Sequence, residues 1–381
     1  MGTILFLVFA GLLLIASLYY LFTPYAAWRL FRKTPSSANP LPPVSIFKPL
    51  KGAPKDLYAN LASFCHLDYP AFQLLFGVRD LHDPAVTVVQ RLQQDFPDCD
   101  IALIVNPEII GSNNKVSTLH HLSRAARYDI FVITDGDVRV QPNYLRAIIP
   151  PLTEPEVGLI TCPYRSHMTT RVPAFVESLL INTVFTSLVL VASQIEKTSY
   201  AFGATIAVKR RCLEDIGGFA TLADYLADDY YLGYLVTQAG YQARIVPHVV
   251  ETRPGVSTFG ELFHHQLRWA RTQRTCRPAG YFGTLVIYGT VWALLGLAAF
   301  WPSPWMRALA LLTVSLRLLS TAVVGKVFLR TSRTLRTLWL VPLTDVLSFL
   351  VWCLSLRGNT VRWGESTFQV QRDGKMASVS S

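Results

Sequence analysis

The chain has 381 residues, of which 51% are hydrophobic and 16% charged, and its formal net charge is +10. Its mean hydropathy of +0.32 is too high for an ordinary soluble enzyme and too low for a pure channel or transporter. The composition therefore indicates a soluble part joined to a few membrane segments, and the length allows one large domain or two modest ones.

The positions of the basic residues and of the cysteines indicate which kinds of partner and site the chain can have. Many basic residues flank apolar segments instead of clustering with aromatic residues, which favours a membrane surface over a nucleic acid as the partner. The six cysteines are scattered and contain no C-x-x-C pair, so neither a disulfide framework nor a zinc site is predicted. Reduced thiols are consistent with a soluble part that faces the cytosol.

The first predicted element is a membrane anchor at residues 3–22, a nearly uncharged apolar run of about 20 residues. No basic residue precedes this run and no small-residue cleavage site clearly follows it, so we expect an anchor and not a cleaved signal peptide. Arg29, Arg32 and Lys33 come next, and the positive-inside rule then places the following residues in the cytoplasm. A linker rich in Pro, Ser and Asn is predicted at residues 35–43.

Strand-like and helix-like patterns alternate beyond the linker. This βαβαβ rhythm predicts an α/β fold with a parallel sheet covered by helices. Such sheets bind ligands beyond the carboxyl ends of their strands, where Lys48, Asp80 and Asp135 occur. The predicted strands are 44–47, 72–78, 101–105 and 130–133, and the predicted helices are 57–65, 85–96, 115–127 and 143–149.

The second half of the chain contains four further apolar segments. Residues 172–192 are interrupted by Glu177 and Asn182, so we expect an amphipathic helix on the membrane or over the sheet, with a true span as the alternative. Residues 281–301, 304–327 and 338–356 are each long enough to cross a bilayer. Arg317 is a charge inside the second of these three, and Pro342 and Asp345 suggest that the third is kinked or re-entrant.

The basic residues between the last two segments, Lys326, Arg330, Arg333 and Arg336, belong on the cytoplasmic side. The sequence does not decide on which side of the membrane the tail from residue 357 lies. The predicted organisation is an anchor at 1–24, a juxtamembrane linker at 25–43, a catalytic domain with interfacial helices at 44–280, membrane segments at 281–356 and a polar tail at 357–381.

Two of the polar clusters follow the first two predicted strands. Lys48 and Lys51, with Gly52, suit a phosphate-bearing ligand, although a solvated lysine loop explains them equally well. Asp83 is placed to cap the helix at 85–96, which leaves Asp80 without an obvious structural task. Asp80 can accept hydrogen bonds from the base or ribose of a nucleotide.

The sequence Asp135-Gly136-Asp137 has two possible interpretations. Asp-Gly between apolar runs is a hairpin signal, but Pro142 breaks the run that would return as the second strand. Two carboxylates at a strand end also suit a divalent cation that is shared with substrate phosphates. We favour the second interpretation.

The last two clusters lie at residues 226–236 and 263–274. One carboxylate of Asp228-Asp229 can cap the helix that follows, and the other is then free to act as a general base. Arginines recur at helical spacing in the second cluster, where they can bind phosphates or touch anionic lipid. They are Arg268, Arg271 and Arg274, beside Trp269, His264 and His265.

The motifs FKPLKG, VRDLHDPA, DGDVRV, ADDYYLG and HQLRWARTQR, in this order and between apolar segments, resemble the ceramide glucosyltransferases of glycosyltransferase families 2 and 21. The chain is also similar to bacterial glycosyltransferases that add an amino sugar to hopanoid lipids. This resemblance implies a multi-pass membrane enzyme with a Rossmann-like GT-A catalytic domain in the cytoplasm, at the inner membrane if the source is bacterial, and one N-terminal and about three C-terminal membrane helices.

The resemblance also implies roles for individual residues. Asp229 is the expected catalytic base, and Asp135 and Asp137 are the expected ligands of Mg²⁺ or Mn²⁺. The nucleotide-sugar side is expected to include Lys48, Lys51, Asp80, Lys115, Asp135, Arg268 and Trp269. The acceptor side is expected to include Gly203, Ala204, Thr205, Asp228 and His265, although His265 stands where the family motif has Gln or Arg.

The expected reaction is transfer of glucose or N-acetylglucosamine from a UDP-sugar to the hydroxyl of a membrane lipid, with ceramide as the first candidate. The alternative acceptor is a hopanoid, bacteriohopanetetrol. A processive polysaccharide synthase should have more spans and a Gln at position 265, and a non-catalytic scaffold should lack the aspartates. The sequence leaves the oligomeric state open.

Overall fold

The computed structural model describes residues 2–32, 41–364 and 366–378. The chain forms two compact units. The helical unit comprises Met1–Arg32, Met168–Glu196 and Val256–Thr367, and the sheet unit comprises Lys33–His167, Lys197–Gly255 and Phe368–Ser381. The predicted linker at residues 35–43 lies mostly outside the described residues.

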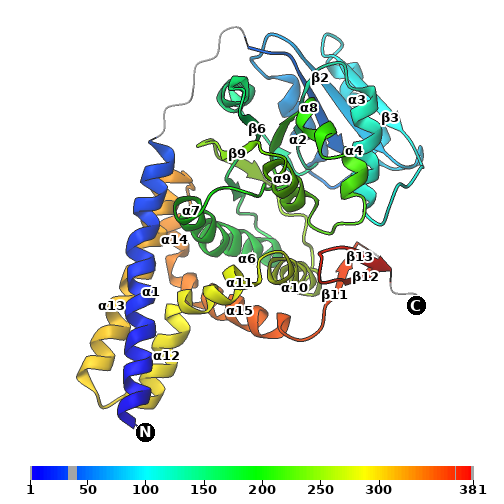
Figure 1. Cartoon of the computed structure of the whole chain (residues 1–381). Coiled ribbons are helices and arrows are strands. Elements are labelled where there is room, and N and C mark those ends of the chain that lie inside the picture. Colours follow the sequence, from blue (N-terminus) through cyan, green and yellow to red (C-terminus); the bar gives the residue numbers. More distant parts are fainter. Residues whose placement is uncertain (1, 33–40, 365, 379–381) are drawn as a thin grey trace. The chain divides into compact units, whose positions relative to one another are not determined.

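A seven-stranded sheet forms the centre of the sheet unit, in the order β3-β2-β1-β4-β8-β6-β9 (Figure 1). Strands β3, β2, β1 and β4 are parallel, as the alternating pattern predicts. Strand β8 is antiparallel to both β4 and β6, so the sheet is mixed and not wholly parallel as expected. Between β6 and β8 the chain passes through Met168–Glu196 of the helical unit, so these two strands are not linked by the short crossover helix that parallel strands usually share. The strands are β1 (Val44–Pro49), β2 (Phe72–Val78), β3 (Ile101–Val105), β4 (Ile130–Ile133), β6 (Val157–Thr161), β8 (Ile206–Lys209) and β9 (Gln242–Ile245).

Helices cover both faces of this sheet and bury two hydrophobic cores. Successive strand residues point to opposite faces, so Ile46 packs in one core and Phe47 in the other. The first core includes Leu61 and Val89, and the second includes Leu122 and Val236. The helices of the first face are α2 (Leu57–Cys65), α3 (Ala85–Asp95) and α5 (Tyr144–Ile148), and those of the second are α4 (Asn114–Ala125), α8 (Arg210–Asp215) and α9 (Asp228–Gln238).

A small sheet, in the order β5-β10-β7, follows the Asp-Gly-Asp sequence. Strand β5 (Val138–Arg139) pairs with β10 (Val250–Thr252), and β10 pairs with β7 (Tyr164–Ser166). Strand β5 pairs with a strand more than a hundred residues later and not with β4. Asp135-Gly136 is therefore not the turn of a β-hairpin, in agreement with the interpretation we favoured.

The helical unit contains the predicted apolar segments. Among the described residues, four helices are long and apolar enough to cross a membrane, and a pair bent by 52° brings the number to five if it is one span. The first extends to Phe31, beyond the predicted end at residue 22. Helices α1, α12 and α13 lie side by side (Figure 1). The four are Gly2–Phe31, Val172–Ile195, Pro304–Phe328 and Thr334–Ser355, and the bent pair is Pro278–Ile287 with Gly289–Phe300.

The individual helices have the following bounds. They are α1 (Gly2–Phe31), α6 (Val172–Leu180), α7 (Thr186–Ile195), α10 (Phe259–Cys276), α11 (Pro278–Gly283), α12 (Gly289–Phe300), α13 (Pro304–Val323), α14 (Thr334–Thr337) and α15 (Val341–Ser355). A π-helical turn, Ile181–Phe185, joins α6 to α7, so residues 172–195 form one continuous, mostly buried helix. Its length and composition allow the true span that was the alternative for this segment.

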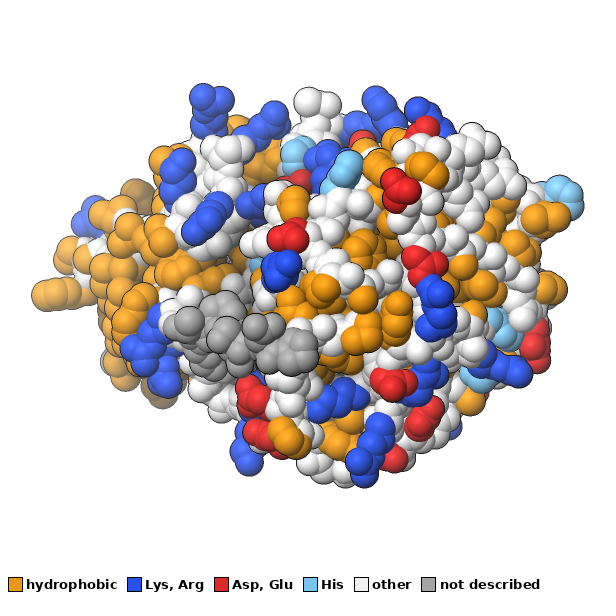
Figure 2. Space-filling model, turned by 90° about the horizontal axis from the view of Figure 1, so that it is seen from above, with side chains coloured by type: hydrophobic (Ala, Val, Ile, Leu, Met, Phe, Trp, Pro, Cys, Tyr) orange, Lys and Arg blue, Asp and Glu red, His pale blue; other side chains and the backbone are white. Residues whose placement is uncertain are grey.

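Basic residues gather at one end of α1 and α13. The rings of Phe31 and Phe328 lie 5.5 Å apart, which brings the ends of these two helices together. Arg29 lies in the last turn of α1, and Lys326 lies next to Phe328. In Figure 2, hydrophobic side chains gather at the left of the view with Lys and Arg side chains beside them. This arrangement fits membrane helices whose basic ends face the cytoplasm.

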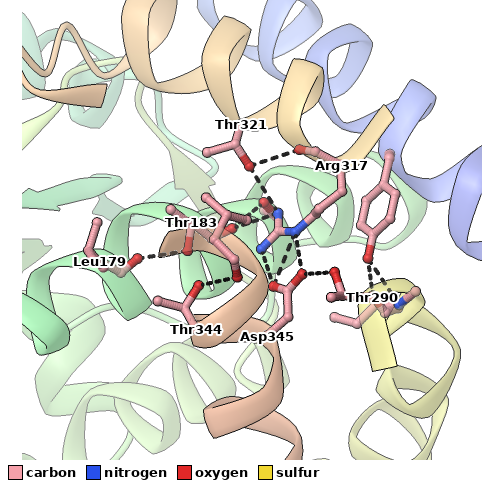
Figure 3. Close-up of polar contacts among 12 residues, drawn as sticks. Leu179, Thr183, Thr290, Arg317, Thr321, Thr344 and Asp345 are labelled. Atoms are coloured by element: carbon pink, nitrogen blue, oxygen red, sulfur yellow. Dashed lines mark hydrogen bonds and ion pairs between the residues drawn. The ribbon is translucent and has the colours of Figure 1, made fainter. Parts of the chain in front are cut away.

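Arg317 and Asp345, the two charges predicted inside apolar segments, form an ion pair (Figure 3). Their side chains are almost completely buried, and the Arg317 Nη2 to Asp345 Oδ1 distance is 2.7 Å. Thr290 donates a hydrogen bond of 2.6 Å to Asp345, and Arg317 donates one of 3.3 Å to the carbonyl of Thr183. The pair therefore connects α13, α15 and α12 with the π-helical turn. Mutual neutralisation explains how both charges occur in apolar segments.

The polar tail predicted from residue 357 contains three strands: β11 (Thr360–Trp363), β12 (Ser366–Val370) and β13 (Met376–Ser378). Strands β12 and β13 pair antiparallel through Phe368–Val370. This hairpin belongs to the sheet unit, where Met376 N donates to Asp224 O and Tyr231 OH donates to Asp373 O. The tail thus supports the segment that leads into α9, a contact that the sequence did not predict.

Candidate active site

Three parallel strands bring polar residues to one edge of the seven-stranded sheet. Lys48 lies near the end of β1, Asp80 follows β2, and Asp135 follows β4. The carboxyl ends of parallel strands meet at the same edge, which is the ligand-binding edge of open α/β sheets.

The buried side chain of Lys48 supports the loop after β4. The Lys48 side chain is fully buried, its Nζ donates a 2.9 Å hydrogen bond to the carbonyl of Asp135, and it lies 3.7 Å from the centre of the Phe64 ring. Burial lowers the pKa of Lys48 to about 7, against the opposing effect of Asp137 and Asp135. Burial, and then the adjacent Asp135 carboxylate, raise the pKa of Asp137 to about 7. Lys48 thus supports the Asp-Gly-Asp loop from inside the fold.

Lys115 joins the end of β4 to the start of α9. Its Nζ lies 2.8 Å from Asp135 Oδ1 and 3.3 Å from Asp228 Oδ2. Asn113 caps the helix that carries Lys115, because its side chain accepts a hydrogen bond from Val116 N. Burial lowers the pKa of Lys115, but the carboxylates of Asp135, Asp228 and Asp229 outweigh that effect and hold the pKa above its usual value. The ammonium group therefore stays charged between two carboxylates.

Asp229 is fixed by two backbone groups. Its Oδ2 accepts a 2.8 Å hydrogen bond from Gly203 N, and its Oδ1 accepts one of 2.8 Å from Tyr230 N. Burial, and then the neighbouring Asp228 carboxylate, raise the pKa of Asp229 to about 6. A carboxylate with this pKa is ionised at neutral pH and is more basic than an ordinary aspartate, as a general base requires.

Gly203 lies between the two groups of carboxylates. A Cβ atom at this position would be 3.2 Å from Asp135 Oδ2, 3.4 Å from Asp229 Oδ2 and 3.6 Å from Lys115 Nζ. The missing side chain leaves space that these two carboxylates border. The structure thus brings together five of the residues predicted for the site: Lys115, Asp135, Gly203, Asp228 and Asp229.

The prediction that Asp228 or Asp229 caps α9 is wrong. Helix α9 begins at Asp228 itself, and its N-cap residue is Ala227, which makes no side-chain cap hydrogen bond. Asp228 pairs with Lys115 instead. Acidic side chains in the first turn still interact favourably with the helix dipole, which explains the pattern that suggested a cap.

Other predicted residues lie apart from this group. The Asp80 side chain is exposed and accepts a hydrogen bond from His82 N, and Lys51 is also exposed. Asp83 accepts a hydrogen bond from Ala85 N at the start of α3, as predicted. The backbone beyond Gly203 turns into the core. Ala204 and Thr205 are buried there, and Thr205 is hydrogen-bonded to Tyr144.

The predicted residues of the arginine-rich cluster lie on α10, in the helical unit. The guanidinium of Arg268 lies 5.7 Å from the centre of the Trp363 ring, and the rings of His265 and Trp269 are 4.6 Å apart. His265 Nδ1 pairs with the buried carboxylate of Glu177 on α6. Sequence reasoning noted Glu177 as an interruption of an apolar segment but missed its pairing. A lone acidic residue in an apolar helix was the available signal.

The carboxylates can be tested against a divalent cation. Among the described residues, no three His, Cys, Asp or Glu side chains are grouped as a complete metal site. Mg²⁺ and Mn²⁺ sites of nucleotide enzymes, however, often use only one or two carboxylates and complete the coordination with phosphate oxygens and water. Asp135 is 39% exposed, and Gly203, which has no side chain, lies beside its Oδ2 atom. These residues fit a cation that is shared with a phosphate-bearing substrate.

Comparisons with known proteins agree with this geometry. The sequence profile described as Glycosyl transferase family 21 matches residues 8–376. The chain is 28% identical to Ceramide glucosyltransferase 1 of Caenorhabditis elegans over 256 residues, which are 67% of this chain and 54% of that protein. It is 26% identical to Ceramide glucosyltransferase 3 of the same organism, over 67% of this chain and 55% of that protein. The chain thus spans about half the length of these relatives.

A solved structure supports the fold. A mannosyltransferase from Pyrobaculum calidifontis, in complex with GDP-Man and Mn²⁺, superposes with a TM-score of 0.52 at 20% identity and covers 91% of this chain and 99% of its own. The expected GT-A-type α/β fold with one N-terminal and three C-terminal long apolar helices is therefore confirmed.

Proposed function

The chain belongs to glycosyl transferase family 21, and we propose that it is an inverting glycosyltransferase that moves a hexose from a UDP-sugar to the hydroxyl of a membrane lipid. The observation that carries this proposal is the pair of backbone hydrogen bonds that fix Asp229 beside the Lys115–Asp135 pair. These hydrogen bonds hold the Asp229 carboxylate, whose pKa is raised, next to the charged Lys115 ammonium group at the ligand-binding edge of the sheet.

We assign the donor to the Asp135 side of this group. Asp135 and Asp137 would hold Mg²⁺ or Mn²⁺ together with the diphosphate of the donor, and the cation would neutralise charge on the leaving group. The positive charge of Lys115 acts on the same developing charge. Asp80 and Lys51 belong to the proposed donor side, and Lys48 contributes by holding the loop of Asp135 from inside. A donor role for Arg268 and Trp269 rests on the family resemblance alone.

We assign the proton transfer to Asp229. Its carboxylate takes the proton from the acceptor hydroxyl as the hydroxyl oxygen attacks the anomeric carbon and the bond to the diphosphate breaks. One displacement inverts the anomeric centre and needs no covalent intermediate on the protein. The acceptor side then includes Gly203 and Asp228, with Ala204 and Thr205 supporting the loop from the core. An acceptor role for His265 rests on the family resemblance alone.

The membrane helices support a lipid acceptor. Within the described part of the chain, four helices are long and apolar enough to span a bilayer, and the basic ends of α1 and α13 favour a cytoplasmic catalytic part. The related nematode proteins are named ceramide glucosyltransferases, so ceramide is our first candidate for the acceptor. A polyisoprenoid alcohol such as a hopanoid is the alternative.

A donor and acceptor panel tests the proposal. Membranes that contain the protein are incubated with UDP-glucose or UDP-N-acetylglucosamine, ceramide or a hopanoid alcohol, and Mg²⁺ or Mn²⁺, and the products are identified by mass. Matched membranes with the Asp229→Asn variant are the control. We expect one hexosylated lipid that the control does not make. If every pairing yields no glycolipid in the presence of metal, the proposal is refuted.

A further inference from the structure

One face of the small sheet β5-β10-β7 carries a row of charged residues. Glu251 of β10 is paired in register with Arg139 of β5 and with Arg165 of β7. Residues directly opposite each other on neighbouring strands share a face of the sheet, and so do residues two apart on one strand. Arg253, two residues after Glu251, therefore continues the same row.

Two arginines and one histidine in this row contact the carboxylate of Glu251. Arg165 Nη2 lies 3.1 Å from Glu251 Oε2, and Arg253 Nη2 lies 3.3 Å from Glu251 Oε1. His167 Nδ1 lies 3.3 Å from the same Oε1 atom. Arg139 bonds a neutral partner, because its Nε donates to Asn60 Oδ1 at 3.3 Å. The side chains of Arg139, Arg165 and Arg253 thus carry three permanent positive charges beside the one negative charge of Glu251.

The side chains of this basic face are partly buried, and the opposite face of the sheet packs in the core. The side chains of Arg165, Glu251 and Arg253 are 28%, 20% and 19% exposed. The opposite face of the sheet is core, where Val138, Ser166 and Val250 are buried. The Nε atom of Arg253 is buried and has no hydrogen-bond partner in the structure. A cross-strand ion pair with Glu251 explains the presence of Arg165. It does not explain why Arg139 and Arg253 lie on the same face, or why the buried Nε atom of Arg253 has no acceptor.

The position of the basic face in the chain suggests the kind of anion it meets. Met168 begins a segment of the helical unit directly after His167, and Val256 begins another three residues after Arg253. The cluster is therefore joined to the helical unit at two points, and the first connection leads within a few residues into the apolar helix Val172–Ile195. Arginine forks match the oxygen atoms of phosphate groups, and anionic headgroups are the phosphates available at a membrane surface.

We propose that Arg139, Arg165 and Arg253 form a binding site for a phosphate group, supplied by an anionic phospholipid headgroup. Glu251 holds the guanidinium groups in position and offsets part of their mutual repulsion. Arg253 N also donates a 3.0 Å hydrogen bond to the carbonyl of Asp137, so a bound headgroup would tie the membrane surface to the Asp-Gly-Asp loop. This site is separate from the carboxylates of the proposed reaction, and its occupancy requires neither donor nor acceptor.

Lipid retention by the full-length protein tests the site. The protein is purified in detergent, exposed to equal amounts of phosphatidylglycerol and phosphatidylcholine, and examined by native mass spectrometry. We expect phosphatidylglycerol to be retained preferentially. Arg253→Gln and Arg139→Gln should each reduce its retention about fivefold, the contribution expected of one basic side chain at a membrane surface. Arg146→Gln, which removes an exposed arginine paired with Asp68 in the same unit, is the matched control and should have no effect.

A second titration separates a lipid phosphate from a soluble one. Inorganic pyrophosphate is titrated into the wild type and Arg253→Gln by calorimetry without metal, and thermal unfolding verifies that the variant is folded. Equal retention of both lipids by the wild type, or unchanged phosphatidylglycerol retention in folded Arg253→Gln, overturns the proposal. Loss of pyrophosphate binding with unchanged lipid retention would also overturn it, because the site would then serve a soluble phosphate.

Discussion

Replacing Asp229 by Asn is the sharpest test of the proposed mechanism. The amide keeps one oxygen, so it can accept a hydrogen bond from Gly203 N or Tyr230 N but not from both. Losing one hydrogen bond to a charged group costs about 1.5–3 kcal/mol. Against this, the rise in the pKa of Asp229 to about 6 means that its ionisation in the fold costs roughly 3 kcal/mol, which Asn does not incur. The two terms nearly cancel, so the variant should fold.

Activity should respond very differently from stability. Removing a positioned general base lowers kcat by about 10²–10⁴-fold. In the wild type, kcat/KM should rise about tenfold per pH unit below about pH 6 and level off above it, because Asp229 must be ionised in the free enzyme to accept the proton. We expect Asp229→Asn to lose turnover while it retains UDP binding measured by calorimetry.

The pH dependence of stability gives an independent measurement. A carboxyl group whose pKa is raised by folding favours the protonated form in the fold, so it destabilises the ionised protein as the pH rises from about 4 through about 6. The free energy of unfolding of Asp229→Asn relative to wild type should therefore increase over that range and stay constant above it. Asp228→Asn, which weakens the Lys115 pair instead, is the matched control. Unchanged turnover in Asp229→Asn would refute the base assignment.

Three further results are expected. Gly203→Ala should lower kcat at least tenfold with little change in melting temperature, since its Cβ would lie 3.2 Å from Asp135 Oδ2; wild-type turnover would show that this space is not used. Chelation with EDTA should abolish transfer, and Asp135→Asn should weaken Mn²⁺ binding in the presence of UDP about tenfold by calorimetry; equal affinity would remove Asp135 from the proposed metal ligands. Arg317→Met or Asp345→Leu should each destabilise the protein by about 3–5 kcal/mol in denaturant titrations, and the double variant by less, because a single change leaves one buried charge without its partner; equal losses in the single and double variants would contradict this account.

Much of the sheet unit was predictable from local patterns. Strand and helix periodicities predicted β2, β3, β4 and α2 with their observed bounds, because each element buries a face that its own residues define. The family resemblance predicted from the ordered motifs is also confirmed, as is the glycosyltransferase class of enzyme. The roles assigned to individual site residues stay predictions.

Several features depended on contacts between distant parts of the chain. The antiparallel direction of β8 follows from its neighbours β4 and β6, and no residue within β8 encodes it. Neither Asp228 nor Asp229 is the N-cap residue that was expected, and Asp228 pairs with Lys115, which lies far away in sequence. The tail strands β12 and β13 could not be assigned to the sheet unit before their pairing was known.

The sequence by itself determined the apolar segments, the first four strands of the main sheet and the acidic and basic residues available for chemistry, since these depend on composition and periodicity along the chain. Only the tertiary structure decided which charges meet: Lys115 with Asp135 and Asp228, Glu177 with His265, and Arg317 with Asp345. A charge is stable inside the fold only if folding brings a partner to it, and the sequence does not specify that partner.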